Sequence, residues 1–365
     1  MDRRDFVSKG AAAAALGSLI GCGAKSSSTD KASSKKKHRW RLAMVVTKIL
    51  PLWADGVQRF ADLVKILSEG RLDITVYGAG DLFPAMEVFD QVKNGRVQMG
   101  HSAAYYWKGK LPASVFFTSI PFGMNGAGMN AWIRNGGGQE LWDELYNPEG
   151  LMGIPMGTTG VQFGGWFRKE IKSVDDFKGL KMRMPGLGGQ VIAKAGAQEI
   201  TLPGGDIFTS LQTGVIDATE WIGPYHDTIM GFYKAADYYY TGGWQEPGSL
   251  LELLINKDAW EELDEHLQTI VRTAASQVHL EMSSAWIAED AKAFQKLKTF
   301  PNVKIRSFPV DLIRTLRGYA DEVLQDIAGT SPLAKKVHDS YKSFQKTHQA
   351  YEDVSELAYA SYLRS

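Results

Sequence analysis

The sequence predicts an α/β fold of two lobes with a ligand cleft between them, followed by long C-terminal helices. Two stretches, 39–101 and 162–220, each alternate apolar strand patterns with amphipathic helix patterns, which is typical of sheets covered by helices. A glycine-rich segment at 157–160 separates them, and the pattern from residue 257 onward is almost wholly helical. Roughly 325 residues follow the N-terminal segments, more than one hydrophobic core usually holds, so two lobes are expected.

The first stretch predicts five elements in order. Residues 39–46 have the pattern of a buried strand, 55–69 of an amphipathic helix, and 72–77 of an alternating strand. A helix at 84–93 then leads into a strand at 97–101. This order predicts a doubly wound, largely parallel sheet with helices on both faces.

The second stretch repeats the rhythm. Strands are predicted at 162–168, 180–184 and 215–220. Helices are predicted from Ser173, which opens a capping box, and at 188–195 and 206–213. The C-terminal part predicts long helices at 258–298, 310–327 and 332–363.

Residues 1–22 resemble an export signal. The twin arginine Arg3-Arg4 resembles the start of a Tat signal, and an alanine-rich run at 10–21 follows it. That run of about twelve residues is too short to span a bilayer, which needs roughly 20.

Cys22 ends this segment in a sequence, Leu-Ile-Gly-Cys, that resembles a lipoprotein cleavage box. We expect Cys22 to be lipidated, which would tether the protein to a membrane; the alternative is a cysteine removed with the signal peptide. The serine- and lysine-rich residues 23–38 then form a flexible tether.

Composition excludes several classes. The chain has 41 basic and 41 acidic side chains, a balance that argues against nucleic-acid binding. Cys22 is the single cysteine, so no intramolecular disulfide can form. No long apolar segment follows it, and the ten tryptophans and fourteen tyrosines include candidates for the lining of a binding cleft.

Three stretches resemble the solute receptors of TRAP transporters (extracytoplasmic solute-binding proteins, family 7). Residues 78–100 (GAGDLFPAMEVFDQVKNGRVQMG) resemble the first family signature, and 205–218 (GDIFTSLQTGVIDA) resemble the second. Residues 177–183 (FKGLKMR) are similar to the strand that holds the family's carboxylate-binding arginine.

Two further stretches resemble one branch of that family. Residues 160–168 (GVQFGGWFR) and 218–225 (ATEWIGPY) are similar to receptors of 2-oxo acids (α-keto acids) or related 2-hydroxy acids. The resemblance implies a ligand held by an arginine and a cation, inside a two-lobed fold like that of type II periplasmic binding proteins. It also implies a long helix crossing both lobes and, in some members, a homodimer through the C-terminal helix.

The resemblance also sets expected lobe limits. Lobe I is expected to comprise residues 39–160 and 249–288, and lobe II residues 161–248 and 289–316. Residues 317–365 are expected to form C-terminal helices.

Arg183 is the predicted substrate-carboxylate ligand. Alternation in the strand places Arg183 on the face opposite Met182, a pattern that also fits a charge on a solvated strand face. Ligands of open α/β sheets bind beyond the carboxyl ends of strands, and Arg183 ends its strand just before a glycine-rich turn. A guanidinium matches a carboxylate with two parallel hydrogen bonds.

A cation site is predicted beside Arg183. The resemblance makes the side chains of Gln162, Glu220 and Glu246, with the carbonyl oxygen of Trp221, its ligands, and Gln162 would also contact the substrate. An all-oxygen set suits a hard cation, Na⁺ or Ca²⁺, better than zinc. Two carboxylates, one arginine and a monoanionic ligand sum to about −2 in a closed cleft, which Ca²⁺ would cancel and Na⁺ would halve.

Aromatic residues are expected to form the walls of the cleft. Tyr105 follows a strand at the expected cleft edge, where its hydroxyl could donate to the ligand, and Trp221 and Trp244 could cover the apolar side. Each aromatic residue alone is more often part of a core.

The resemblance implies a periplasmic receptor, not an enzyme, that delivers a small monocarboxylate resembling pyruvate or lactate to TRAP membrane subunits. Three alternatives remain open: a receptor for a dicarboxylate or sugar acid, a surface sensor partner, and a secreted hydrolase or lyase that uses Glu220 and Glu246 as acid and base. A dinucleotide fingerprint at 186–191 is weak because Val191 replaces its third glycine. His101 is predicted to be structural.

Overall fold

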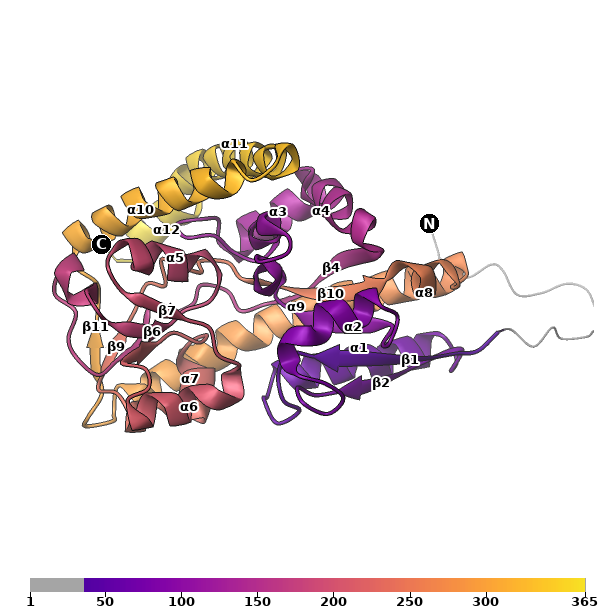
Figure 1. Cartoon of the computed structure of the whole chain (residues 1–365), viewed down its shortest axis with the longest axis horizontal. Helices are drawn as coiled ribbons and strands as arrows, with labels where there is room; N and C mark the ends of the chain where they lie inside the picture. The colour runs from indigo at the N-terminus through magenta and orange to yellow at the C-terminus, as the bar shows by residue number, and fades with distance from the viewer. Residues whose placement is uncertain (1–35, 365) are drawn as a thin grey trace, which may run out of the picture. The chain divides into compact units, whose positions relative to one another are not determined.

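The computed structural model describes residues 36–364, which form two mixed β-sheets with helices packed on them (Figure 1). The predicted signal at 1–22, including Cys22, and most of the predicted tether lie outside the described residues. Within residues 36–364, no helix has the length and apolar character that a membrane crossing requires.

The first sheet has five strands in the order β2-β1-β3-β10-β4. Its strands are β1 (His38–Met44), β2 (Leu72–Tyr77), β3 (Met99–Ser102), β4 (Leu151–Thr158) and β10 (Leu250–Asn256). β1 pairs in parallel with β2 and β3, whereas β10 lies antiparallel between β3 and β4. Every residue of β4 and β10 is buried, so this side of the sheet is covered on both faces.

The second sheet has six strands in the order β11-β9-β5-β8-β6-β7. Its strands are β5 (Gly165–Phe167), β6 (Lys181–Arg183), β7 (Gln198–Ile200), β8 (Ala218–Thr219), β9 (Tyr238–Tyr240) and β11 (Lys304–Arg306). β6 is parallel to β7 and β8, and β5 is antiparallel to β8 and β9. We call the part built on the first sheet lobe I and the part built on the second lobe II.

Amphipathic helices cover both sheets. In α1 (Trp53–Leu67) the residues Val57, Phe60 and Val64 recur at helical spacing and are buried against lobe I. The other helices of lobe I are α2 (Val88–Lys93), α3 (Gly126–Asn135), α4 (Gly138–Tyr146) and α8 (Lys257–Glu261). Those of lobe II are α5 (Gly186–Lys194), α6 (Gly204–Thr213) and α7 (Pro224–Met230).

Two extended segments and one long helix connect the lobes. The segments are residues 159–164, between β4 and β5, and 241–249, between β9 and β10. The helix α9 (Glu265–Leu297) contacts α1 and β4 of lobe I and α7 of lobe II (Figure 1). At 1.5 Å per residue its 33 residues extend about 50 Å, enough to cross both lobes.

The C-terminal helices link the lobes a second time. α10 (Val310–Ala328) packs on α5 of lobe II, and α11 (Pro332–Val354) packs on α3 and α4 of lobe I. The chain then bends at Ser355 into α12 (Glu356–Tyr362), in which no residue is buried.

The predicted two-lobed α/β class with long C-terminal helices is confirmed. The prediction of a largely parallel sheet is wrong, because β10 and β5 pair with their neighbours in antiparallel orientation. The single helix predicted at 258–298 is broken between α8 and α9, where Asp264 caps the second helix by accepting a hydrogen bond from the Leu267 amide. His38, predicted as the end of the tether, is instead the first residue of β1 and pairs with Leu72. The other strand residues fall in the ranges predicted for their lobes, and the lobe limits themselves remain a prediction.

Candidate functional site

The two connecting segments lie side by side and carry Gln162 and Glu246. The amide of Gln162 donates to the carbonyl of Glu246 at 3.1 Å, and the amide of Gly243 donates to the carbonyl of Gln162 at 2.9 Å. A Cβ at position 243 would overlap that carbonyl oxygen, so the close approach requires glycine. This short ladder fixes where both side chains leave the backbone.

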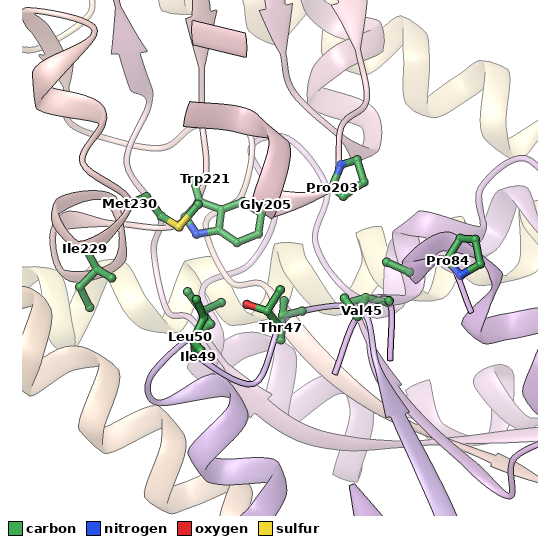
Figure 2. Close-up of a pocket in the computed structure, with 15 residues that line it drawn as sticks. Val45, Thr47, Ile49, Leu50, Pro84, Pro203, Gly205, Trp221, Ile229 and Met230 are labelled. Carbon is green, nitrogen blue, oxygen red and sulfur yellow. The ribbon is translucent and has the colours of Figure 1, made fainter. Parts of the chain in front are cut away.

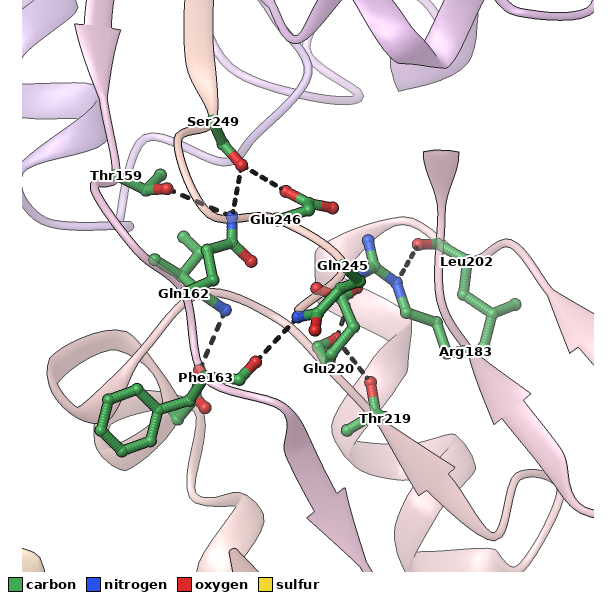
Figure 3. A network of polar contacts seen from close by, with 12 residues as sticks. Thr159, Gln162, Phe163, Arg183, Leu202, Thr219, Glu220, Gln245, Glu246 and Ser249 are labelled. Atoms are coloured by element: carbon green, nitrogen blue, oxygen red, sulfur yellow. Dashed lines mark hydrogen bonds and ion pairs between the residues drawn. The ribbon is translucent and has the colours of Figure 1, made fainter. Parts of the chain in front are cut away.

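Ser249 orients the two side chains. The Gln162 side-chain nitrogen donates to Ser249 Oγ at 3.3 Å and to Thr159 Oγ1 at 3.2 Å, and Ser249 Oγ donates to Glu246 Oε2 at 2.6 Å (Figure 3). Because the amide nitrogen is held by these acceptors, Gln162 Oε1 points away from them. Glu246 likewise keeps its second oxygen, Oε1, free of Ser249.

Arg183 and Glu220 come from adjacent strands of lobe II. Arg183 ends β6 opposite Thr219 of β8, and Glu220 follows directly. Arg183 Nη1 donates to the Glu220 carbonyl at 3.0 Å and forms an ion pair with its carboxylate, and Nε donates to the Leu202 carbonyl at 3.5 Å. Both side chains are buried, at 1% and 0% exposure, which excludes the solvated strand face as the setting of Arg183.

The site holds two buried carboxylates and one guanidinium. Burial raises the pKa of Glu220 well above its usual range, with Arg183 opposing and Glu246 reinforcing the increase. Burial also raises the pKa of Glu246 to about 7, opposed by the Ser249 hydrogen bond, by Arg183 and by the Tyr105 hydroxyl. An environment that penalises both negative charges favours a cation or a proton between them.

The unpaired oxygens of the site fit a hard cation. Among the described residues, Gln162 Oε1, Glu220 Oε2 and Glu246 Oε1 are buried and accept no hydrogen bond of normal geometry. Buried polar atoms are nearly always partnered, and oxygens from one amide and two carboxylates are the donor types that Na⁺ and Ca²⁺ prefer. Within residues 36–364, no three or more His, Cys, Asp or Glu side chains are grouped so that they could hold a metal ion by themselves.

Aromatic side chains border the site from both lobes. Tyr105, in the 3₁₀ helix η2 (Ala104–Trp107), packs against lobe II, where a Cβ at Gly186 would lie 3.4 Å from its ring, and its pKa is raised well above the ordinary value by burial and by Glu246. The Arg183 guanidinium carbon lies 5.0 Å from the centroid of the Trp221 ring. Trp244 instead stacks on Phe122 of lobe I, with ring centroids 5.6 Å apart.

An apolar cavity of about 500 Å³ opens beside Trp221 (Figure 2). Val45 and Leu50 line it from lobe I, and Pro203 and Met230 line it from lobe II. Trp221 therefore contacts the guanidinium of Arg183 and also lines this cavity.

The structure brings Gln162, Arg183, Glu220, Glu246, Trp221 and Tyr105 into one region, whereas Trp244 packs on Phe122. The binding roles of these residues remain predictions. Tyr106 was missed, although its pKa also responds to Arg183, Glu246 and Glu220. Ser249 and Gln245 were missed as well; Gln245 Nε2 donates to the Phe163 carbonyl at 2.9 Å and its Oε1 is buried without a partner among the described residues. Tyr106 could have been found from the sequence because it directly follows Tyr105, whereas no local pattern distinguishes Ser249.

Comparison with known proteins identifies relatives along the full chain. Residues 43–330 match the family described as bacterial extracellular solute-binding protein, family 7 (DctP). A monocarboxylate 2-oxoacid-binding periplasmic protein of Nostoc sp. is 38% identical over 365 residues, covering 100% of both chains.

Two solved structures are also similar. A TRAP periplasmic solute-binding protein of Colwellia psychrerythraea with bound calcium and pyruvate has 41% identity and a TM-score of 0.87, over 90% of this chain and 100% of that one. One from Pseudoalteromonas atlantica with bound sodium and pyruvate has 42% identity and a TM-score of 0.87, over 89% and 99%.

The family match spans most of the chain, and the two-lobed fold agrees with these structures. The family consists of extracellular solute-binding proteins and not of enzymes. This chain belongs to bacterial extracellular solute-binding protein family 7, the DctP family of TRAP solute receptors.

Proposed function

We propose that this protein binds a small 2-oxo or 2-hydroxy monocarboxylate through Arg183 and a cation, and does not transform it. One observation carries the proposal: Arg183 Nη2 is a buried donor without a partner among the described residues, and the carboxylate with which Arg183 forms its ion pair has an equally buried and unpartnered oxygen, Glu220 Oε2. A 2-oxo acid has an anionic end for the guanidinium and a carbonyl oxygen for a cation.

The cation would be held by the side chains of Gln162, Glu220 and Glu246 and by the carbonyl oxygen of Trp221. It would offset the excess negative charge of the two glutamates, so that an anionic ligand could enter. Both sodium and calcium accompany pyruvate in similar proteins, and the oxygen donors here suit either ion.

The ligand's other groups would meet the aromatic border. Tyr105 would donate its hydroxyl to the ligand, and Gln162 and Trp221 would contact it directly. Trp244, which stacks on Phe122, would cover the apolar side of the ligand. The cavity beside Trp221 is apolar, so it would receive a hydrocarbon side chain and would not favour the second carboxylate of a dicarboxylate or the hydroxyls of a sugar acid.

The receptor would hand its ligand to the membrane subunits of a TRAP transporter. We propose that residues 1–22 direct Tat-type export and that lipidation at Cys22 anchors the protein on the periplasmic side of a membrane. A homodimer through the C-terminal helix is also proposed. Its basis is the exposure of apolar side chains on α11 and α12, namely Tyr351, Val354, Leu357, Tyr359 and Tyr362.

Titration calorimetry of the purified protein with 2-oxo and 2-hydroxy acids of increasing side-chain length tests the proposal. Runs with chelator, with sodium and with calcium separate the two ions, and dicarboxylates and sugar acids serve as competitors. Binding of a 2-oxo acid that requires a cation and yields no product is expected. Equal binding in chelator and sodium-free buffer would contradict the cation, and product formation would contradict a pure receptor.

A further inference from the structure

An ion pair joins the two lobes beside the candidate site. Lys108 of lobe I donates from Nζ to the Glu199 carboxylate at 2.7 Å and to the Gly186 carbonyl at 2.6 Å, both in lobe II. The Lys108 and Glu199 side chains are 23% and 24% exposed, so the pair is largely shielded from water. A shielded ammonium with two acceptors is held more strongly than an exposed surface pair.

On the lobe II side, Glu199 is tied to the strand that carries Arg183. Glu199 of β7 pairs with Met182 of β6, one position before Arg183 pairs with Ile200. Its carboxyl group packs so closely on α5 that a Cβ at Gly189 would overlap it. Glu199 is therefore confined between α5 and Lys108, and it moves with Arg183.

On the lobe I side, Lys108 is tied to the aromatic border of the site. It follows η2 directly, and its amide donates to the Tyr105 carbonyl at 3.1 Å. The same short helix carries Tyr105, whose ring would lie 3.4 Å from a Cβ at Gly186 of lobe II, and Tyr106, whose ring packs edge-on against it with centroids 4.7 Å apart. A displacement of Lys108 relative to lobe II would carry both tyrosines with it.

We propose that Lys108 and Glu199 are positioning residues that hold the tyrosine border of lobe I over the ligand site of lobe II. The ion pair touches neither ligand nor cation; it raises the fraction of receptor in which the lobes are together, and the apparent affinity for a ligand scales with that fraction. The inference rests on the proposed function for the identity of the ligand, but not for the contact between the lobes.

Single and double variants test the contact. Lys108→Met keeps the aliphatic stem and removes the charge, and Glu199→Gln keeps the shape of the acceptor. We expect each to speed dissociation of a bound 2-oxo acid about three- to tenfold, and the double variant to do no more than Lys108→Met alone, since Lys108→Met already removes the bonds to both Glu199 and Gly186. Cation affinity should not change, because no proposed cation ligand comes from η2 or β7.

Lys93→Met is the matched control. Lys93 pairs with Glu149 at 2.6 Å within lobe I, so its loss removes a comparable ion pair without touching the lobe contact. Its dissociation rate should stay within about twofold of the parent. Equal effects of Lys93→Met and Lys108→Met, or additive effects of Lys108→Met and Glu199→Gln, would overturn the proposal.

A readout without ligand separates this inference from the proposed function. Spin labels at the exposed positions Ile66 in lobe I and Val215 in lobe II, introduced as Ile66→Cys and Val215→Cys in a Cys22→Ser chain, report the distance between the lobes. Lys108→Met should shift the ligand-free distribution to longer distances, and Lys93→Met should not. A lower melting temperature without such a shift would show a merely structural role and overturn the proposal, whereas a parent chain that binds no 2-oxo acid would overturn the proposed function alone.

Discussion

Arg183 holds Glu220 at two points, because its Nη1 hydrogen bonds the Glu220 carbonyl at 3.0 Å and forms an ion pair with the Glu220 carboxylate. Both residues are almost completely buried, so the direction of the guanidinium is fixed before any ligand arrives. The arrangement leaves Arg183 Nη2 and Glu220 Oε2 buried without a hydrogen-bond partner among the described residues. In the proposed function, this one residue pair would contribute to both the anion site and the cation site.

The first prediction concerns the shape of the guanidinium. Arg183→Lys keeps the charge but loses the planar fork, so the Kd for a 2-oxo acid should rise at least about tenfold with the fold retained. Arg183→Ala leaves the Glu220 carboxylate without its partner and should also lower the free energy of unfolding by about 3 kcal/mol. Calorimetry and urea unfolding measure the two effects. A lysine variant with the parent affinity would rule out a contact that depends on the guanidinium group.

The second prediction concerns the cation. Glu246→Gln replaces a proposed carboxylate ligand with a neutral amide, so the affinity for calcium or sodium should fall at least about tenfold. Glu252→Gln is the control, because Glu252 is also a buried carboxylate but is occupied by hydrogen bonds from Ser102, Trp107 and Tyr146. Ion titration followed by calorimetry should separate the two variants. Similar losses in both would show that overall stability, not coordination, is responsible.

The third prediction concerns a variant that should weaken binding of the ligand more than binding of the cation. The proposed cation ligands come from lobe II and the connecting segments, whereas Tyr105 comes from lobe I. Tyr105→Phe should therefore weaken 2-oxo acid binding about three- to tenfold, the usual value of one hydrogen bond, and change the cation Kd by less than that, because the hydroxyl acts on only one proposed cation ligand, Glu246. Tyr146→Phe, which removes a buried hydroxyl elsewhere in lobe I, is the control. A parallel loss of cation affinity in Tyr105→Phe would contradict this division.

The fourth prediction is a loss of stability in acid. Burial lowers the pKa of His101, His226 and His279 to about 4, from an ordinary value of 6.5. Between pH 6.5 and pH 4 these histidines bind protons in the unfolded chain but not in the folded chain. Their contribution to the free energy of unfolding is therefore fully present above pH 6.5 and is lost as the pH falls toward 4. Each histidine contributes at most about 1.4 kcal/mol per pH unit.

Urea unfolding between pH 7 and pH 4 measures that slope. His101 accepts from Trp53 Nε1 at 2.8 Å and lies 2.8 Å, through its other nitrogen, from the Met156 carbonyl. His101→Gln should lower stability at pH 7 and flatten the acid slope by about one proton. An unchanged slope would show that this histidine is not responsible.

The fifth prediction concerns assembly. Tyr359→Glu and Tyr362→Glu place charges on the exposed apolar side of α12, so they should abolish a dimer formed there. Thr347→Glu, on an exposed polar position of α11, should leave it intact. Sedimentation velocity distinguishes the outcomes, and a parent protein that stays monomeric at high concentration would refute the dimer.

Local pattern was enough to predict some elements and not others. β2 (Leu72–Tyr77) and α1 follow clear periods of 2 and 3.6, because each has one buried and one exposed side. β4 and β10 were not predicted, since a strand buried on both faces has no alternation to detect. Without β10, its antiparallel pairing could not be foreseen.

The sequence by itself determined the two-lobed α/β class, the family and the candidate residues Arg183, Gln162, Glu220 and Glu246, because motif and composition are local properties of the chain. The tertiary structure decided the burial, the orientation and the neighbours of those residues. Burial of Arg183 follows from the packing of lobe II, and the orientation of Gln162 and Glu246 follows from Ser249, 87 residues from Gln162. The contact between Lys108 and Glu199 likewise forms only where the two lobes meet. Contacts between lobes, pKa values and unpaired buried atoms all depend on distances in space, which the spacing of residues along the chain does not encode.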